Sequence, residues 1–366
     1  MPFECYGLRP PAGVAQFLKP DLAAFASNFQ TPKVEQASLN LEREVAHRLA
    51  VGASYMYVHG ENLIRARDVN LPPPVNVTYQ LYDSSGANFL GTYYNVASFS
   101  TWQLTPSLTC AFPPCINSPS RPISQLGAAD VFESAASSVY NGATLSIRRR
   151  MTGGLYFMLS YTFAHAIDDG QDALVAGRPA TVQNSYAPSS ERGSSVTDQR
   201  QRLAFSWVVA PRPFHRGHEW LGTVFNNWKM AGIATYGSGR PVNATVAGDA
   251  NQDGNSTNDR LPGARRNSFI GPDYATTDIR LTRRIYAGDR LKMELVGESF
   301  NLLNRDNRRV LITEDGFQSN SASFVQKSKR IGINRFPAQY RVPGNFLRAT
   351  SAYAPRQMQL ALKVIF

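Results

Sequence analysis

The last eleven residues of the chain read Arg356-Gln357-Met358-Gln359-Leu360-Ala361-Leu362-Lys363-Val364-Ile365-Phe366. Apolar side chains occupy every second position from Met358 to Phe366, and polar side chains stand at Gln357, Gln359 and Lys363 between them. This alternation predicts a β-strand with one apolar face and one polar face. A soluble sheet can end this way, and so can a transmembrane β-barrel, which has lipid outside and a polar lumen inside. The rest of the chain decides between the two.

The same alternation recurs in other segments. We expect a hairpin over residues 34–45 and 49–57, joined by Ala46-His47-Arg48, and a second over 139–148 and 155–163, joined around Gly153-Gly154. Further strands are expected over 203–209, 228–241, 279–285 and 291–298, of which 228–241 alternates least clearly. With the final strand this makes about nine, with boundaries uncertain by a few residues. Residues 75–82 are a further candidate strand inside the proline-rich stretch from Glu61 to Ser137, which otherwise reads as a loop.

The connections alternate between short and long. The short ones follow Val45, Arg150 and Tyr286; the long ones follow Gly60, His165, Pro241 and Asn304, and a moderate one follows Ala210. Outer-membrane barrels have short periplasmic turns and long extracellular loops, whereas a soluble β-sandwich has no reason to alternate so regularly. The predicted fold is therefore all-β: an antiparallel transmembrane barrel, partial, with about 9–12 strands.

We divide the chain into an irregular segment, 1–33, as the remnant of an extracellular loop, and a barrel segment, 34–366. The start of the chain, Met1 to Tyr6, shows no basic head followed by an apolar core. The first and last expected strands both run toward the short turns, although bacterial single-chain barrels have even strand numbers. We therefore expect a strand ahead of the first one, and we expect that Met1 is not the native start.

Composition narrows the function classes. The chain has 366 residues, 43% hydrophobic and 18% charged, and a net charge of +11. We find no apolar run of the roughly 18 residues that a membrane helix needs. Nucleic-acid binding is disfavoured because the arginines are scattered and no nucleic-acid-binding motif is present; a basic lumen or basic loops fit better. Cys110 and Cys115 flank Ala-Phe-Pro-Pro, a spacing that permits a small disulfide loop or two free thiols.

Several motifs resemble, in order and spacing, the barrel of Oar-like TonB-dependent receptors, from about residue 31 to the end. They are Thr31-Pro32 with Leu41-Glu42-Arg43-Glu44 and Tyr55-Met56-Tyr57-Val58; Asp198-Gln199-Arg200-Gln201-Arg202; Trp228-Lys229 with Tyr236-Gly237-Ser238-Gly239-Arg240-Pro241; Asp249-Ala250-Asn251-Gln252-Asp253-Gly254 with Asp259-Arg260; and Glu298-Ser299-Phe300-Asn301-Leu302-Leu303-Asn304.

The resemblance implies an outer-membrane transporter whose barrel is plugged by an amino-terminal domain and which takes up a ligand with energy passed through TonB. The chain shows no plug or TonB box, so it corresponds to the carboxyl-terminal part, and the TonB complex would act only through the missing amino-terminal part. Outer-membrane lipid is the expected surrounding. The ligand class stays open among siderophores, glycans and peptides. The alternatives are a passive porin-like channel and a non-transport structural or adhesion protein.

One segment matches the opening of a calcium loop. Asp249, Asn251 and Asp253 place oxygen ligands at alternate positions, and Gly254 follows for the bend. The bidentate Glu expected at the twelfth position is replaced by Arg260, and Asp259 could substitute for it. The alternative, an Asn/Asp/Gly-rich external loop without a metal, is the one we favour.

The other polar residues form no recognisable catalytic or metal-binding motif. His165, Asp168, Asp169 and Asp172 sit where a strand ends and could bind a cation or ligand, although a solvated loop base is favoured; His215 and His218 lack a third ligand. No catalytic triad, paired carboxylate or phosphate loop stands in a suitable context, and Gly237-Ser238-Gly239 lacks the spacing of a hydrolase elbow. We expect no enzymatic activity.

The alternation also predicts on which face of each strand the aromatic and arginine side chains lie. Interfacial girdles are predicted from Tyr55, Tyr57, Tyr161, Trp207, Trp228 and Tyr286; core aromatics of a soluble sheet are the alternative. Arg148, Arg202, Arg280 and Arg284 alternate with the apolar residues and are predicted to face the lumen. Arg149 falls on the apolar phase, but next to a turn, where a lipid-facing arginine costs only about 0–1 kcal/mol.

Overall fold

The computed structural model describes residues 20–99, 103–104, 116–117, 121–170, 181–211, 226–243, 251–255, 259–261, 264–287, 291–310, 325–326, 338–341, 349 and 351–366. Six residues singled out above lie outside these ranges: Cys110, Cys115, Asp172, His215, His218 and Asp249.

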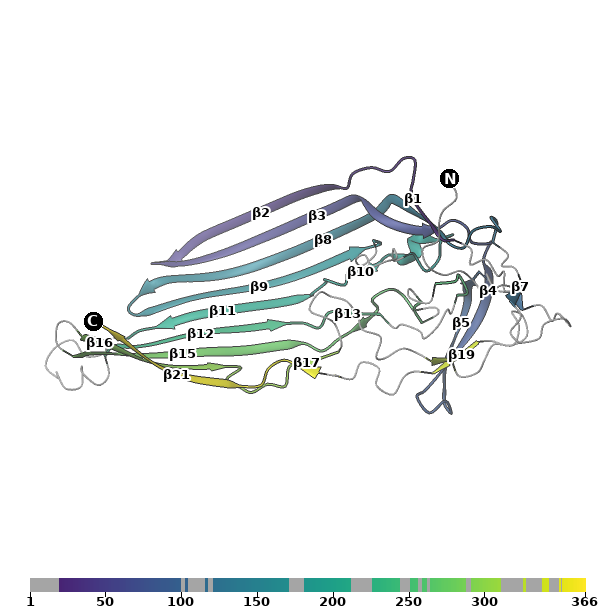
Figure 1. The fold of residues 1–366 in the computed structure, drawn as a ribbon. Coiled ribbons are helices and arrows are strands. Elements are labelled where there is room, and N and C mark those ends of the chain that lie inside the picture. The colour runs from purple at the N-terminus through teal and green to yellow at the C-terminus, as the bar shows by residue number, and fades with distance from the viewer. Residues whose placement is uncertain are drawn as a thin grey trace.

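A single large antiparallel sheet dominates the structure (Figure 1). Its path of strands runs β2-β3-β8-β9-β11-β12-β15-β16-β21. The bounds are β2 Lys33–Ala46, β3 Leu49–Asp68, β8 Ala129–Thr152, β9 Leu155–Asp168, β11 Gln201–Val209, β12 Trp228–Gly237, β15 Tyr274–Ala287, β16 Leu291–Phe300 and β21 Gln357–Ile365. Two short strands join it off this path: β1, Leu22–Phe25, pairs parallel with β8, and β10, Gly193–Ser194, pairs with β9. The predicted all-β antiparallel fold is confirmed, and each expected strand is present.

Several boundaries differ from the prediction by about five residues, and the strand Phe89–Ser98 lies in a stretch expected to be a loop; the largest differences are at β3 and β8. β3 continues to Asp68 and β8 begins at Ala129, where a loop was expected on both sides. Their pairing shifts register around Leu63 and Ile64, and such bulges break the alternation that sequence reading depends on. In addition, the segment 1–33, expected to be irregular, contains β1 and the first residue of β2. At about 3.3 Å per residue, β8 with its 24 residues is far longer than a membrane requires.

Cross-strand register separates the side chains into two faces. Directly paired residues share a face, so one row of apolar side chains runs Leu41, Ala53, Leu145, Tyr161, Leu203, Tyr236. The next row, on the other face, runs Glu42, Gly52, Ser146, Ser160, Ala204, Thr235. The apolar face is open to the surroundings: Leu41, Leu145, Leu281 and Leu360 are 65%, 60%, 42% and 85% exposed. We call the two surfaces the apolar face and the polar face.

The arginines follow the same division. Arg148, Arg280 and Arg284 lie on the polar face and pair with Glu42, Glu298 and Glu294 at 2.9, 3.2 and 2.6 Å. Arg202 pairs in register with Thr162 on that face. Arg149 lies on the apolar face between Leu49 and Phe157, as predicted.

Five of the six proposed girdle aromatics lie on the apolar face, and the prediction for the sixth is wrong. Tyr286 pairs with Lys292 and shares the polar face with Arg284. Its aromatic character and its place beside a turn predict an interfacial position, but in β15 the apolar face near the strand end is occupied by Ile285. The strand alternation, not the aromatic character, fixes the face.

The two ends of the sheet are unlike. At one end, the turn end, β2 and β3 are joined through His47 and Arg48, and β8 and β9 through Gly153 and Gly154. At the other, the loop end, the long connections gather into a separate layer (Figure 1). One four-stranded sheet in that layer consists of β4 Val75–Tyr82, β5 Phe89–Ser98, β18 Val325–Gln326 and β19 Ala338–Arg341. Three two-stranded sheets pair β6 Gln103–Leu104 with β7 Ile116–Asn117, β13 Pro241–Val242 with β14 Phe269–Ile270, and β17 Arg308–Arg309 with β20 Ser351–Ala352. The layer also contains the 3-10 helix η1 Pro188–Glu191.

The packed core lies in the loop-end layer rather than in the large sheet. The largest fully buried side chains are Tyr79, Phe99, Leu71, Glu191, Val182, Asn70, Asn307, Asp259, Pro241 and Ser98. None of them belongs to the nine strands of the main path. Within the described ranges, no helix has the length and apolar character to cross a membrane. The sheet thus offers an exposed apolar face, and the layer at its end is packed like a soluble domain.

Candidate functional site

The connection before β11 ties two strand ends together at the loop end. Asp198, 3% exposed, accepts a hydrogen bond from the Ala166 backbone N–H at 2.8 Å with one carboxylate oxygen. Its second oxygen lies 3.2 Å from His165 Nδ1 and accepts the Arg200 Nε–H at 3.0 Å. Since Arg200 Nη2 also lies 3.0 Å from His165 Nε2, the imidazole is held on both sides. His165 and Asp198 therefore have structural partners, and the strand-end cation site considered for His165 is occupied by Arg200.

The segment after β12 is held by its neighbours on both sides. Gln199 Nε2 donates to the Ser238 carbonyl at 3.2 Å, and the Gly271 N–H donates to the Arg240 carbonyl at 2.9 Å. A Cβ on Gly239 would lie 1.8 Å from the Gly271 carbonyl oxygen, so only glycine permits this approach. The Tyr236–Pro241 motif thus ends β12 with a close backbone contact to Gly271.

The segment after β16 is held by two asparagines. Asn301 adopts a positive φ of 49°. Its backbone N–H donates a hydrogen bond to Asp278 Oδ1 at 2.8 Å. Asn307, 2% exposed, pairs with both backbone groups of Ala275 at 2.9 and 2.8 Å. The Tyr353 N–H donates to the Asn307 carbonyl at 2.9 Å. The antiparallel pair β17 (Arg308–Arg309) and β20 (Ser351–Ala352) is therefore fastened to the first residues of β15.

These three anchored segments enclose a cavity of about 430 Å³ at the loop end, which we call the mouth cavity. Its described lining is Gln199, Ser238, Arg240, Gly271, Pro272, Tyr274, Arg308, Arg309, Val310 and Tyr353. Tyr274 pairs in register with Gly237 on the polar face, so the cavity lies at the lumen side of the sheet end. The volume falls in the range of about 300–1,000 Å³ that is usual for small-molecule sites.

Buried ion pairs hold the rest of the layer. Glu191, 1% exposed, accepts two bonds from Arg260, at 2.7 Å from Nη1 and 2.9 Å from Nη2. Arg266, 4% exposed, pairs with the Asp168 carboxylate and donates to the Glu191 carbonyl at 2.9 Å. Burial lowers the pKa of Arg266 to about 10, so it stays charged at neutral pH. Asp168 is thereby engaged as a structural partner.

The described part of the candidate calcium loop lies inside this layer. Asn251, Asp253 and Asp259 are all buried, at 4%, 4% and 2% exposed. Their oxygens accept backbone N–H groups of the loop itself: Asp253 N–H to Asn251 Oδ1 at 3.0 Å, Asn255 N–H to Asp253 Oδ1 at 2.7 Å and Asn251 N–H to Asp259 Oδ1 at 3.3 Å. Among the described residues, no group of three or more His, Cys, Asp or Glu is placed to hold a metal ion. The structure brings these three residues together, and the metal assignment stays a prediction.

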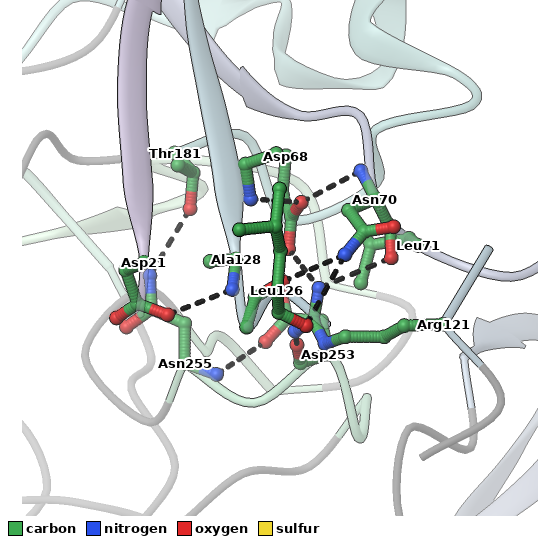
Figure 2. A network of polar contacts seen from close by, with 12 residues as sticks. Asp21, Asp68, Asn70, Leu71, Arg121, Leu126, Ala128, Thr181, Asp253 and Asn255 are labelled. Atoms are coloured by element: carbon green, nitrogen blue, oxygen red, sulfur yellow. Dashed lines mark hydrogen bonds and ion pairs between the residues drawn. The ribbon is translucent and has the colours of Figure 1, made fainter. Parts of the chain in front are cut away.

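The same loop is connected to distant segments (Figure 2). Arg121 donates to the Asp68 carboxylate at 2.6 Å and to the Asp253 carbonyl at 2.5 Å. Asn255 Nδ2 donates to Thr181 Oγ1 at 3.0 Å. Figure 2 shows Asp68, Arg121 and Asp253 meeting at the centre of this network. The loop therefore joins the end of β3 to the segment before β8, through Arg121, and to the connection after β9, through Thr181.

Sequence reading missed the mouth cavity. Its basic and aromatic residues come from four separate segments, and neither Arg240 nor Tyr353 belongs to a pattern with a known chemistry. The local signals are the adjacent pair Arg308-Arg309 within a loop and the resemblance motifs that contain Gln199 and Arg240. Asp169, considered as a ligand beside Asp168, accepts the Ser137 N–H at 2.5 Å.

Among the comparisons with known proteins, the family model supports this architecture. No curated protein matches the chain. Five chains of solved structures match. One is the crystal structure of the outer membrane transporter YddB from Escherichia coli, with 9% identity and a TM-score of 0.43; the match covers 95% of this chain and 34% of that chain. Residues 2–264 match the model of a family described as outer membrane beta barrel domain. The chain thus belongs to the outer membrane beta barrel domain family, whose place is the cell outer membrane.

Proposed function

We propose that this chain is the barrel part of a TonB-dependent outer-membrane receptor, which binds a small ligand at its loop end and takes it up. The loop end then faces the outside of the cell, the turn end faces the periplasm, and the apolar face contacts outer-membrane lipid. The energy would reach the chain through a TonB-interacting amino-terminal part. We propose neither an enzymatic activity nor a nucleic-acid partner.

One observation carries the proposal: two of the motifs that resemble Oar-like receptors line the mouth cavity, through Gln199 and through Ser238 with Arg240, and a third precedes the segment that carries Arg308 and Arg309. Gln199 of the Asp198–Arg202 motif bonds Ser238 of the Tyr236–Pro241 motif, and Asn301 of the Glu298–Asn304 motif is fixed by Asp278. These motifs lie about 40 to 60 residues apart in the sequence, yet all three position the segments around one cavity. A purely structural or adhesive barrel would need loops on its outer surface, but not a cavity assembled from anchored segments at the lumen side.

Uptake measurements in the native host test the proposal. Cells that carry or lack the gene would be given labelled ferric siderophores, oligosaccharides and peptides, with and without a protonophore that abolishes the proton gradient. The proposal predicts gene-dependent uptake of one class, lost with the protonophore. Uptake that survives the protonophore, with conductance of the purified chain in planar bilayers, would establish the passive channel instead. Absence of both would leave the structural or adhesive reading.

A further inference from the structure

We propose that the mouth cavity binds an acidic oligosaccharide, with arginines holding its carboxylates and tyrosines contacting its sugar rings. This inference rests on the proposed function, because it names the ligand class for the same loop-end site. It follows from three features of the cavity: its charge, its aromatic wall and its size.

The charge of the cavity is one-sided. Arg240, Arg308 and Arg309 all line it, and no carboxylate is among its described lining residues. Arg308 uses Nε to bind Asp306 at 2.8 Å, which leaves its Nη groups for another acceptor. The exposed Arg240 side chain makes no hydrogen bond or ion pair with any residue of the described ranges. Guanidinium groups bind carboxylates through paired N–H donors, so the cavity is suited to an anion.

The aromatic wall is formed by two tyrosines. The rings of Tyr274 and Tyr353 lie with centroids 5.0 Å apart at 70°, edge to face. Arg309 stands 4.7 Å from the centroid of Tyr353, which holds its guanidinium at the wall. Tyr353 remains 48% exposed. Rigid aromatic surfaces with a polar tip give contact area to ring-shaped ligands at low entropic cost, and the hydroxyl groups can bond to sugar hydroxyls.

Polar uncharged groups complete the lining. The side chains of Gln199 and Ser238 stand beside the cations, where they can exchange hydrogen bonds with hydroxyl groups. A bare inorganic anion would need only the arginines. An apolar ligand would need neither the arginines nor the polar uncharged side chains. Cations, aromatic rings and hydroxyl-binding groups within about 430 Å³ fit one or two sugar rings that carry carboxylates.

Binding to the purified full chain tests this. Digalacturonate would be titrated by calorimetry against the protein in detergent, beside neutral galactobiose, which has the same rings and linkage without the carboxylates, and beside inorganic phosphate at equal ionic strength. We expect saturable binding of digalacturonate, at least about tenfold tighter than galactobiose, because charge-assisted bonds are lost with the carboxylates. Phosphate is expected to compete only weakly.

Variants locate the site. Arg240→Glu should weaken digalacturonate binding at least about tenfold. The matched control Arg265→Glu changes an exposed arginine that does not line the cavity and should leave binding unchanged. Tyr353→Leu should weaken digalacturonate binding while leaving phosphate competition as it was. Heat-modifiable migration on gels verifies that each variant is folded.

Three results would overturn the inference: equal affinity for digalacturonate and galactobiose, phosphate binding as tightly as digalacturonate, or no binding of either sugar. These results do not bear on uptake, because the titration needs no energy source. Energised uptake of another ligand class with no digalacturonate binding would refute this inference and leave the proposed function standing. Arg240-dependent binding without energised uptake would do the reverse.

Discussion

Replacing Leu145 by Arg should strongly destabilise the membrane-inserted protein. Leu145 lies on the apolar face, in register with Ala53 and Tyr161, and is 60% exposed. It precedes Thr152, the last residue of β8, by seven positions, or about 23 Å along the strand at about 3.3 Å per residue. With a tilt of about 40° this is about 18 Å along the membrane normal, near the middle of an apolar band about 25 Å tall that begins a few Å from the turn.

An arginine at that depth on the lipid side costs about 2–4 kcal/mol. This corresponds to about a 30- to 900-fold shift in the folding equilibrium. Guanidinium titration of the protein in lipid vesicles, followed by tryptophan fluorescence and heat-modifiable gel migration, measures the change. The assay also reports whether the variant reaches the folded state at all.

The neighbouring residue supplies the control. Ser146 lies on the polar face between Gly52 and Ser160, whose small side chains leave room for an arginine. Ser146→Arg should therefore change the stability by less than about 1 kcal/mol, because it neither places a charge in lipid nor disturbs a packed core. Equal losses for Leu145→Arg and Ser146→Arg, or a larger loss for Ser146→Arg, would refute the assignment of the two faces.

Three further predictions concern the loop-end layer. Glu191→Gln leaves the Arg260 guanidinium without its carboxylate partner in a buried place and should cost about 3–5 kcal/mol, measured as a lower denaturant midpoint and faster protease cleavage of the layer. Gly239→Val forces a side chain against the Gly271 carbonyl and should cost at least about 1–3 kcal/mol, whereas Gly91→Val, with no atom within 4 Å of the added Cβ, should be tolerated in the same assay. Hydrogen bonds from Ser85 and Asn88 lower the pKa of Asp83 from 3.8 to about 2. The stability from its bonds to the Ala87 and Asn88 N–H groups is therefore fully present above pH 3.8 and is lost as the pH falls through about 2. Hydrogen exchange of residues 83–88, compared with Asp83→Asn at each pH, should show protection that vanishes near pH 2; equal exchange in both proteins at neutral pH would contradict this.

The large sheet could be predicted because a membrane imposes a simple rule on every strand. Each lipid-facing strand needs one apolar face, and this rule is visible in rows such as that of Leu145 and Tyr161. The rule fails where the chain leaves the membrane: β3 beyond Gly60 pairs through bulges, and its polar and charged residues then face the loop-end layer. The alternation there carries no information about where the strand ends.

The loop-end layer could not be predicted because its contacts join residues far apart in the sequence. Arg121 meets Asp68 and Asp253, and Arg260 meets Glu191 across 69 positions. No periodicity links such pairs, and in a Gly-, Asn- and Pro-rich segment any arginine could equally stand in water. The motif residues Gln199 and Asn301 could be noticed from the resemblance, but their role as anchors follows only from their partners.

Labelling of single cysteines in intact cells tests the proposed orientation of the barrel, with the loop end outside the cell and the turn end in the periplasm. Cys5, Cys110 and Cys115 would be replaced by Ser, and one cysteine would then be introduced at Ser84, at the tip joining β4 and β5, or at His47, in the turn joining β2 and β3. A polyethylene-glycol maleimide too large to cross the outer membrane is the reagent. We predict labelling of Ser84→Cys in intact cells and of His47→Cys only after the outer membrane is opened. Labelling of His47→Cys in intact cells, with Ser84→Cys protected, would contradict the account.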